Sequence, residues 1–432
     1  PSGRMITKGA LVNVLAACTR VQVGDEEKDL DEDVRTGIQN RFEGWSAQGY
    51  RVLGVAVKTV DAKTHPFFPK DETGMTFVGF LLFLDPPKEG VLETIQNLEK
   101  LGVQLKVITG DNKLVAHHIG QVVGLGEVKV VTGAELDDLR DEALWHTVEQ
   151  TTIFAEVNPN QKERIILALK KRGHVVGYMG DGINDAPSLH SADVGISVAN
   201  AVDVAKEAAD LVLLKQDLDV LREGIVQGRK TFANTLKYIF MATSANFGNM
   251  FSMAGASIFL PFLPMLPKQI LLINFLTDLP EMTIASDRVD DVFVERAHRM
   301  DIQFIRRFML VFGPLSSVFD FTTFGVLLWL MKANQQSFQT GWFIESILSA
   351  GVVVFAVRTR LPFLRSRPSR AMLMVTGLVM LVTLWLPYSP LAGLLGFTPL
   401  SLPYLLVIFG IVALYFVSAE FAKRWFYRKF GA

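Results

Sequence analysis

Long apolar runs fill the second half of this chain and restrict what it can fold into. Six segments are apolar enough, and about long enough, to cross a bilayer as helices. They are Ile239–Leu260, Gln269–Ala285, Phe308–Leu330, Trp342–Val357, Ala371–Pro387 and Tyr404–Glu420. Inside hydrocarbon every backbone polar group must find a partner within the protein, which favours helices. We therefore expect an all-α transmembrane domain of about six helices over residues 239–432.

The polar loops between these segments differ sharply in charge. One set of loops holds only Lys268 and Lys332. The other set and the C-terminal tail are rich in basic residues, namely Arg288, Arg296, Arg299, Arg306, Arg307, Arg358, Arg360, Arg365, Arg367, Arg370, Lys423, Arg424, Arg428 and Lys429. Basic loops stay on the cytoplasmic side of a membrane. We therefore expect the basic loops, the C-terminus and the first half of the chain to be cytoplasmic.

The first half of the chain is mixed and charged, as in water-soluble domains. The whole sequence of 432 residues has a formal net charge of −1, which gives no sign of a nucleic-acid partner. Its one cysteine, Cys18, cannot form an internal disulfide, and we expect a buried thiol. The chain does not begin with Met and starts within what reads as a domain, so we expect a fragment of a longer protein.

Two carboxylates follow a short apolar run in the middle of the chain. The run, residues 174–178, predicts a buried strand, and the string from Met179 to Pro187 places Asp181 and Asp185 at its end. In an open α/β sheet, ligands bind at the carboxyl ends of the strands. Two acids held close together favour a cation such as Mg²⁺ between them. The alternative is a solvated turn of Asp, Asn and Gly.

Two further motifs accompany that pair. A predicted strand, residues 104–108, ends at Thr109-Gly110-Asp111, whose hydroxyl and N–H groups would face phosphate oxygens. A predicted helix, residues 161–171, carries Lys162 near its start. A capping turn and a solvent-exposed lysine are the alternatives. The alternation of strands and helices between residues 77 and 214 predicts a parallel, doubly wound sheet.

The first 84 residues alternate short strands and helices and contain one weak motif, Lys8-Gly9-Ala10. A glycine beside the lysine would let backbone approach a ligand closely. A surface turn is the alternative. Arg51 begins a second predicted strand, residues 51–57.

Polar residues inside predicted membrane spans are costly and are functional by default. The first two spans contain Asn246, Asn249, Asn274, Thr277 and Asp278. The helix carrying the last three is interrupted by a proline, and a broken helix offers free carbonyl groups beside a carboxylate. The alternative is packing between helices through amide and hydroxyl groups. Three further acids are lesser candidates: Glu281, Asp320 and Glu345.

Taken together, these motifs resemble the P-type cation-transporting ATPases over essentially the whole chain. The stretches that carry the resemblance are Asp85-Pro-Pro-Lys, Thr109-Gly-Asp and Gly180-Asp-Gly-Ile-Asn-Asp-Ala-Pro. The membrane half looks most like the bacterial magnesium-transporting branch, whereas Asn274-Phe-Leu-Thr-Asp resembles the calcium-pump pattern as much.

The resemblance implies a fold and a domain order. Residues 1–84 would end an α+β nucleotide-binding domain, and residues 85–220 would form a haloacid-dehalogenase-like (Rossmann-like) phosphorylation domain. Residues 221–238 would be a stalk before the membrane domain. The implied location is a bacterial inner membrane, crossed several times.

The resemblance also implies roles. ATP would lie against Lys8 and Arg51, and Mg²⁺ would be held by Asp181 and Asp185. The phosphoryl group would contact Thr109, Gly110, Asp111 and Lys162. A divalent cation, Mg²⁺ above all, would bind Asn246, Asn249, Asn274, Thr277 and Asp278.

The chain also departs from the family pattern. The Asp-Lys-Thr-Gly-Thr string that holds the family's phosphorylated aspartate does not occur in this sequence. We therefore expect the N-terminal half of the pump as a partner, in the same or a separate chain, and expect the fragment alone to be inactive. A calcium or other cation pump and a non-catalytic membrane fragment remain alternatives. A membrane-tethered phosphatase is disfavoured, since no Asp-x-Asp nucleophile follows the strand that ends at Asp85.

Overall fold

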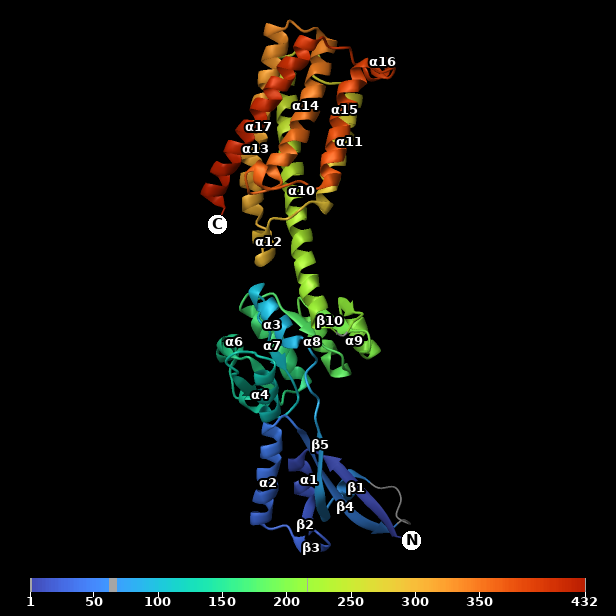
Figure 1. Ribbon diagram of the computed structural model, residues 1–432, viewed down its shortest axis with the longest axis vertical. Helices are drawn as coiled ribbons and strands as arrows, with labels where there is room; N and C mark the ends of the chain where they lie inside the picture. The colour runs from blue at the N-terminus through green and yellow to red at the C-terminus, as the bar shows by residue number, and fades with distance from the viewer. Residues whose placement is uncertain (1, 62–67, 216, 432) are drawn as a thin grey trace. The chain divides into compact units, whose positions relative to one another are not determined.

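The computed structural model describes residues 2–61, 68–215 and 217–431. The chain divides into two compact units, Pro1–Glu223 and Gly224–Ala432 (Figure 1). Each unit has its own buried cores.

The first unit begins with a five-stranded sheet. In spatial order its strands are β1 (Ser2–Gly9), β4 (Arg51–Asp61), β5 (Met75–Phe83), β2 (Cys18–Val23) and β3 (Glu26–Asp29). All pairs are antiparallel except β2 with β5. The helices α1 (Leu11–Ala17) and α2 (Glu32–Ala47) contribute to its core, in which Leu11, Cys18 and Phe77 are buried (Figure 1).

The rest of the first unit alternates short parallel strands with helices. One sheet has the order β6 (Val107–Ile108), β8 (Ile153–Ala155), β7 (Val130–Thr132), and the other has the order β11 (Leu211–Leu213), β10 (Val194–Val198), β9 (Gly177–Met179). The helices are α3 (Val91–Lys100), α4 (Lys113–Val122), α5 (Gly133–Asp137), α6 (Asp141–Gln150), α7 (Pro159–Lys171), α8 (Ala186–Ser191) and α9 (Asp203–Ala208).

The predicted doubly wound sheet is therefore realised only in part. The strands are parallel as expected, but they form two three-stranded sheets, and β5 pairs with the N-terminal sheet instead. β6 has only two residues, so it can form few ladder bonds. Ile108 at its end nevertheless packs against the cores of both parallel sheets.

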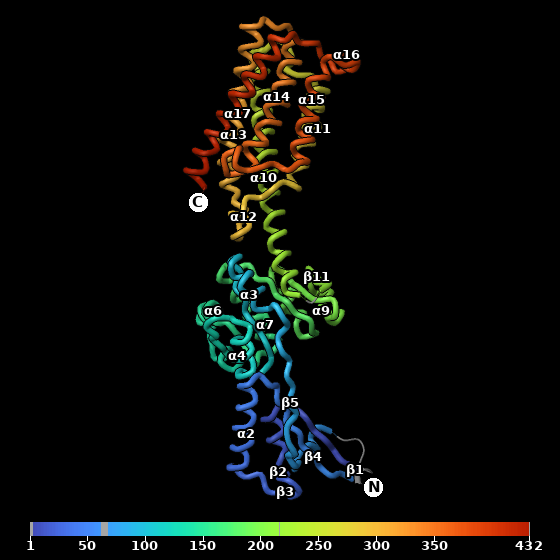
Figure 2. The backbone as a smooth tube through the Cα atoms, in the orientation of Figure 1, coloured from blue at the N-terminus to red at the C-terminus, as the bar shows by residue number. Residues whose placement is uncertain are grey.

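The second unit is a bundle of long helices. They are α10 (Leu218–Phe259, from Gly224 within this unit), α11 (Pro267–Met282), α13 (Ile302–Gly325, continued by a π-helical turn to Leu330), α14 (Gln335–Val357), α15 (Arg370–Trp385) and α17 (Leu402–Phe430), with the short α12 (Asp291–Glu295) and α16 (Ala392–Leu395). Figure 2 shows the long helices running side by side. The predicted stalk, residues 221–238, and the first predicted span form one continuous helix.

Within the described residues, four helices are long and apolar enough to cross a membrane: α13 with its π-helical turn, α14, α15 with its last turn, and α17. The predicted count of six is therefore met only in part. α11 has 16 residues, and the apolar part of α10 is diluted by polar side chains such as Asn246, Asn249 and Ser252.

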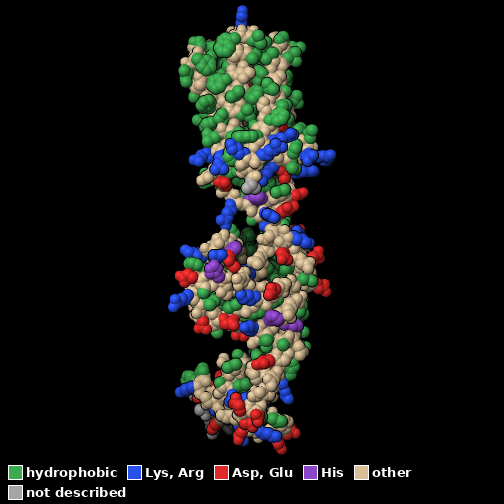
Figure 3. Space-filling view, turned by 90° about the vertical axis from the view of Figure 1, so that its left-hand side faces the viewer, with side chains coloured by type: hydrophobic (Ala, Val, Ile, Leu, Met, Phe, Trp, Pro, Cys, Tyr) green, Lys and Arg blue, Asp and Glu red, His purple; other side chains and the backbone are tan. Residues whose placement is uncertain are grey.

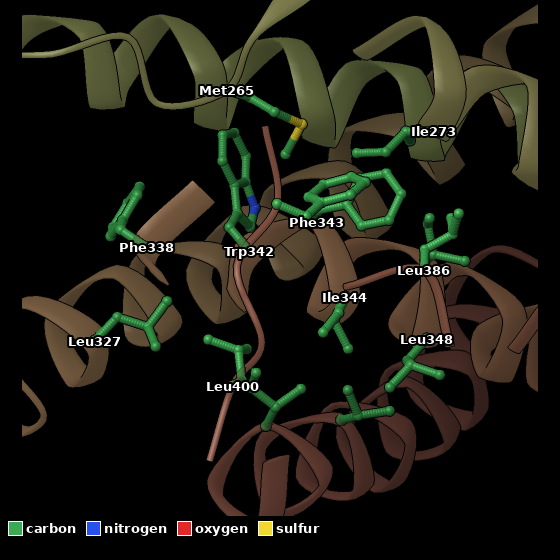
Figure 4. Packing of buried hydrophobic residues seen from close by; sticks show 14 of the residues in the cluster. Met265, Ile273, Leu327, Phe338, Trp342, Phe343, Ile344, Leu348, Leu386 and Leu400 are labelled. Atoms are coloured by element: carbon green, nitrogen blue, oxygen red, sulfur yellow. The ribbon is translucent and has the colours of Figure 1, made fainter. Parts of the chain in front are cut away.

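Three aromatic side chains of α14 lie in the largest core of the bundle, which is otherwise mostly aliphatic. Phe338, Trp342 and Phe343 of α14 are almost completely buried and pack with residues from α11, α13 and α17 (Figure 4). On the outside, apolar side chains cover most of the visible face of this unit and give way to a band of Lys and Arg at one end (Figure 3).

Candidate functional site

The string after β9 forms a tight turn that folds back on itself. The Gly180 N–H donates to the Ile196 carbonyl, which continues the pairing of β9 with β10. A Cβ atom at Gly180 would come within 2.5 Å of the Asp185 Cβ atom. Only glycine therefore allows the Asp185 side chain to lie under the turn.

Asp185 is buried and receives three hydrogen bonds. Lys162 Nζ donates to Oδ1 at 2.8 Å, the Tyr178 hydroxyl donates to Oδ1 at 2.7 Å, and the Gly182 N–H donates to Oδ2 at 3.2 Å. Burial acts to raise the pKa of this carboxyl, but the donors outweigh it and hold the pKa below its ordinary value. Asp185 is thus an ionised acceptor that positions Lys162.

Asp181 is placed differently. It is exposed, and among the described residues its carboxylate accepts no hydrogen bond, whereas its carbonyl accepts from the Val202 N–H. An exposed carboxylate at the end of a parallel strand suits Mg²⁺, which takes one or two carboxylates and keeps positions for water and phosphate oxygens. The side chains present therefore fit this ion, with Asp181 as the available ligand.

The Thr109-Gly110-Asp111 turn is held by the neighbouring strand. The Thr109 N–H donates to the Phe154 carbonyl, and the Thr109 hydroxyl donates to Asp111 Oδ2 at 3.0 Å. Glu156 closes the turn, since its N–H donates to the Asp111 carbonyl and its carboxylate accepts from the Lys113 N–H. Glu156 has a φ of 57°, a left-handed conformation that is uncommon outside glycine.

The structure thus brings Lys162, Asp185 and the Gly180 turn into direct contact. Thr109 follows β6, whose Ile108 packs against the core that contains Tyr178 of β9, and the Gly180 turn follows β9. No motif in the sequence indicates Tyr178 and Glu156 as partners of these turns. Tyr178 reads as an ordinary buried strand residue, and the contact of Glu156 spans 45 residues of chain.

Lys8 and Arg51 lie on the same face of the N-terminal sheet. Lys8 pairs with Val55, and Arg51 is four residues further along β4, so the two are separated by roughly 13 Å along the strand. The opposite face, with Gly54 and Ala56, packs on α1, while Lys8 and Arg51 are both exposed. Arg51 Nε also lies 3.8 Å from Asp111 Oδ1, in the Thr109–Asp111 turn.

The predicted ion ligands of the bundle are spread over two helices. Asn274 and Asp278 lie on one exposed face of α11, and Thr277 donates within the helix to the carbonyls of Ile273 and Asn274. On α10, Asn246 is exposed and Asn249 partly so. In the part of the chain that the structure describes, no group of three or more His, Cys, Asp or Glu could hold a metal, and no hydrogen bond joins the two sets.

The basic loops of the bundle gather at one end. Buried Asp287, after α11, pairs with Lys237 Nζ at 3.0 Å and with Arg358 Nη1 at 3.3 Å, at the end of α14. Lys423 of α17 donates to the Leu361 carbonyl in the same region. At the opposite end, Gln339 donates to the Leu263 carbonyl and the Tyr404 hydroxyl donates to the Met331 carbonyl.

Comparison with known proteins identifies the family. Residues 262–425 match a family model described as "Cation transporting ATPase, C-terminus", and residues 1–90 match one described as "P-type ATPase, cytoplasmic domain N". Together the two cover more than half of the chain. The chain belongs to the P-type ATPase family.

Several P-type ATPases are similar to this chain. "Magnesium-transporting ATPase, P-type 1" of Escherichia coli K12 is 42% identical over 433 aligned residues, 99% of this chain and 48% of that protein. A calcium-transporting ATPase of Listeria monocytogenes is 32% identical over 68% of this chain and 34% of its own length. A putative cation-transporting ATPase of Methanocaldococcus jannaschii is 31% identical over 82% and 42% respectively. This P-type ATPase chain thus spans about half the length of the magnesium-transporting relatives it matches.

Proposed function

We propose that this chain is part of a pump that uses ATP to move a divalent cation, Mg²⁺ above all, across a membrane through an aspartyl-phosphate intermediate. The observation that carries the proposal is the Lys162–Asp185 ion pair under the Gly180 turn, with Asp181 exposed above it. The identity to magnesium-transporting relatives supports the choice of ion.

In this proposal, charge at the phosphoryl group is balanced by groups that are already in place. Lys162 is held by Asp185 and presents an ammonium to the transferring phosphoryl oxygens. The Thr109 hydroxyl and the Asp111 N–H bond within their own turn and would exchange these partners for phosphate oxygens. Preorganised donors of this kind stabilise a phosphoryl-transfer transition state. Asp181, with Asp185 behind it, would hold Mg²⁺, which neutralises phosphate charge when bound. The attacking aspartate would belong to the other half of the pump.

The nucleotide would lie on the open face of the N-terminal sheet. Lys8 and Arg51 are the exposed basic residues on that face proposed here to contact it. Arg51 is 3.8 Å from Asp111, so the same side chain can reach toward the phosphates. Residues 1–84, 85–220, 221–238 and 239–432 would serve as the nucleotide-binding, phosphorylation, stalk and membrane domains, with the second of haloacid-dehalogenase-like fold.

The transported ion would bind on α11, which contrary to the sequence-based expectation continues through Pro280 without a break. Asp278 supplies the carboxylate, and Asn246, Asn249, Asn274 and Thr277 supply neutral oxygens. Asn274 and Asp278 share an exposed helix face, which leaves them accessible to further helices of a complete pump. A site with few carboxylates suits an ion that keeps much of its water, as Mg²⁺ does.

The membrane in this proposal is a bacterial inner membrane, crossed by six helices of this chain, with α10 and α11 as the additional two. The clustering of the basic loops at one end of the bundle supports a cytoplasmic location for that end.

The test joins the first half of the Escherichia coli relative to this chain and expresses the joined protein in a host that lacks Mg²⁺ uptake. We expect growth at low Mg²⁺, and ATPase activity of the purified protein that Mg²⁺ stimulates. A calcium pump would instead show stimulation by micromolar Ca²⁺ without growth. A non-catalytic fragment would show neither, although the relative's own two halves restore both.

A further inference from the structure

Two carboxyl side chains meet in the interior of the helical unit. Asp320 of α13 is 3% exposed and Glu345 of α14 is 1% exposed. Glu345 lies one turn after Trp342, whose indole N–H donates to Asp320, so the two carboxyl groups come close together. They come from positions 25 residues apart, on opposite sides of the turn that joins the helices. A contact between two carboxyl groups requires a proton, because two bare carboxylates would repel each other.

Asp320 is the charged member of the pair. The Ser252 hydroxyl of α10 donates to its Oδ2 at 2.6 Å, and the Trp342 indole N–H donates to its Oδ1 at 2.8 Å. An indole N–H can only donate a hydrogen bond. Asp320 Oδ1 therefore faces a proton donor, whereas the oxygen of a metal ligand would face a cation. Trp342 is itself locked in the aromatic core with Phe338 and Phe343 (Figure 4).

Glu345 is the member that needs the proton. Within the described residues its Oε2 atom has no hydrogen-bond partner, although the side chain is almost completely buried. An ionised carboxylate in that position would be an unpaired buried charge. The hydroxyls of Ser349 and Tyr415 also lie near the pair. Among the described residues no ion pair joins either acid to a Lys, Arg or His.

We propose that Asp320 and Glu345 share a single proton and form a buried proton-binding site in the bundle. Glu345 carries the proton and donates it to the ionised Asp320, which Ser252 and Trp342 hold from two other directions. The ligand is a proton delivered by water, and the site is separate from the predicted cation ligands on α11.

The site is connected to a helix that can change its proton affinity. Ser252 lies on α10, whereas Asp320 lies on α13, so any displacement of one helix against the other removes a donor from the charged carboxylate. Losing a hydrogen bond to the charged form favours protonation. The pair can therefore take up or release a proton when α10 moves. This inference does not depend on which cation is pumped.

Infrared spectroscopy of the whole chain in lipid nanodiscs tests the proposal without ATP or transport. A protonated carboxyl gives a C=O stretch that shifts in heavy water. We expect the wild type to show this band at neutral pH, where exposed carboxyl groups are ionised. Glu345→Gln should lose it while keeping its helix content, because the amide still donates to Asp320. Asp320→Asn should retain a band from Glu345, and Ser252→Ala should retain it to higher pH than the wild type.

Two matched controls separate this site from its neighbours. Glu281→Gln, in α11, should not change the loss of the protonated-carboxyl band that Glu345→Gln causes. Glu420→Gln, at the Lys423 ion pair, should have no effect on the band. The proposal is wrong if Glu345→Gln leaves the protonated-carboxyl band intact, or if Mg²⁺ or Ca²⁺ abolishes the band in the wild type, since a cation would then occupy the pair.

Discussion

Lys162 and Asp185 form an ion pair 2.8 Å long between side chains that are only 15% and 11% exposed. The same Asp185 oxygen accepts a hydrogen bond from Tyr178, and the other oxygen accepts from the Gly182 N–H. The lysine is thus set in place by the fold before any phosphate arrives. The two aspartates of the motif therefore differ in role. Asp185 orients the Lys162 side chain, and the Asp181 carboxylate remains available to a metal ion.

Replacing Asp181 by Asn should abolish phosphoenzyme formation in the joined pump described above. The amide keeps the shape of the side chain but cannot bind Mg²⁺ as a carboxylate does. Loss of one stabilising electrostatic group at a reacting centre lowers the rate by about 100-fold or more. Incorporation of label from γ-labelled ATP measures the effect.

Nucleotide binding is the control for the Asp181 variant. Lys8 and Arg51 lie on the N-terminal sheet, away from this carboxylate in the chain, so a fluorescent ATP analogue should bind with nearly unchanged affinity. Normal incorporation of the label by the Asp181→Asn variant would mean that Asp181 does not bind the metal ion.

The bonds to Asp185 should make the region around β9 sensitive to acid. Its pKa is lowered in the folded protein, so its contribution to stability is full above the unfolded pKa of about 3.9 and is lost as the pH falls through the folded pKa. Hydrogen exchange in β9 and α8 should accelerate in that acid range. Tyr178→Phe removes one donor, worth about 1 kcal/mol, and should accelerate exchange even at neutral pH. Asp181→Asn, which removes an exposed carboxylate, should leave the exchange profile as in the wild type.

Asp278→Asn should abolish cation-stimulated ATPase activity and growth rescue by the joined pump. The substitution removes the only carboxylate among the five predicted ion ligands while keeping the side chain's shape. The helical unit should therefore melt at nearly the wild-type temperature. Asp291→Asn, at the start of α12 and exposed, is the matched control and should rescue growth fully. Wild-type rescue by Asp278→Asn would mean that this residue only packs between helices.

Reporter fusions should place the two ends of the bundle on opposite sides of the membrane. A fusion after Arg365 should report the cytoplasm, because this loop lies at the basic end with Asp287 and Lys423. A fusion after Asn334 should report the far side, because the neighbouring Met331 carbonyl is held by Tyr404 at the opposite end. A cytoplasmic signal from both positions would contradict the proposed six-helix topology.

The single cysteine should resist thiol reagents while the N-terminal sheet is folded. Cys18 is 3% exposed, and burial raises its pKa to about 11, with Arg35 opposing the shift. The thiol is therefore neutral at physiological pH, and its contribution to stability is full below the unfolded pKa of about 8.5 and is lost as the pH rises through about 11. A maleimide should label it only after denaturation. Val12→Cys in a Cys18→Ser background, at a position 72% exposed, should react at once. Equal labelling rates would contradict burial of the thiol.

Periodicity and composition were sufficient for the elements themselves. Apolar runs predicted the helices of the bundle, and four of them are confirmed as long and apolar enough to cross a membrane. The strand predicted at residues 51–57 is part of β4, Arg51–Asp61, and the helix predicted to carry Lys162 over residues 161–171 is α7, Pro159–Lys171. These features depend on residues close together in the chain, which is why a sequence specifies them. The motifs Thr109–Asp111 and Met179–Pro187 follow strand ends for the same reason.

Only the tertiary structure decided which side chains meet. Ser252 reaches Asp320 across 68 residues and Asp287 reaches Arg358 across 71, and no periodic pattern encodes such contacts. The pairing of β5 is also a result of the tertiary structure. Its apolar pattern fits the N-terminal sheet and a parallel sheet alike, and long-range hydrogen bonds pair it with β4. Sequence by itself determined the elements and the residue types at their ends. Packing determined that Asp185 would hold Lys162 and that Ser252 and Trp342 would hold Asp320, because burial and the choice of partner depend on the whole fold.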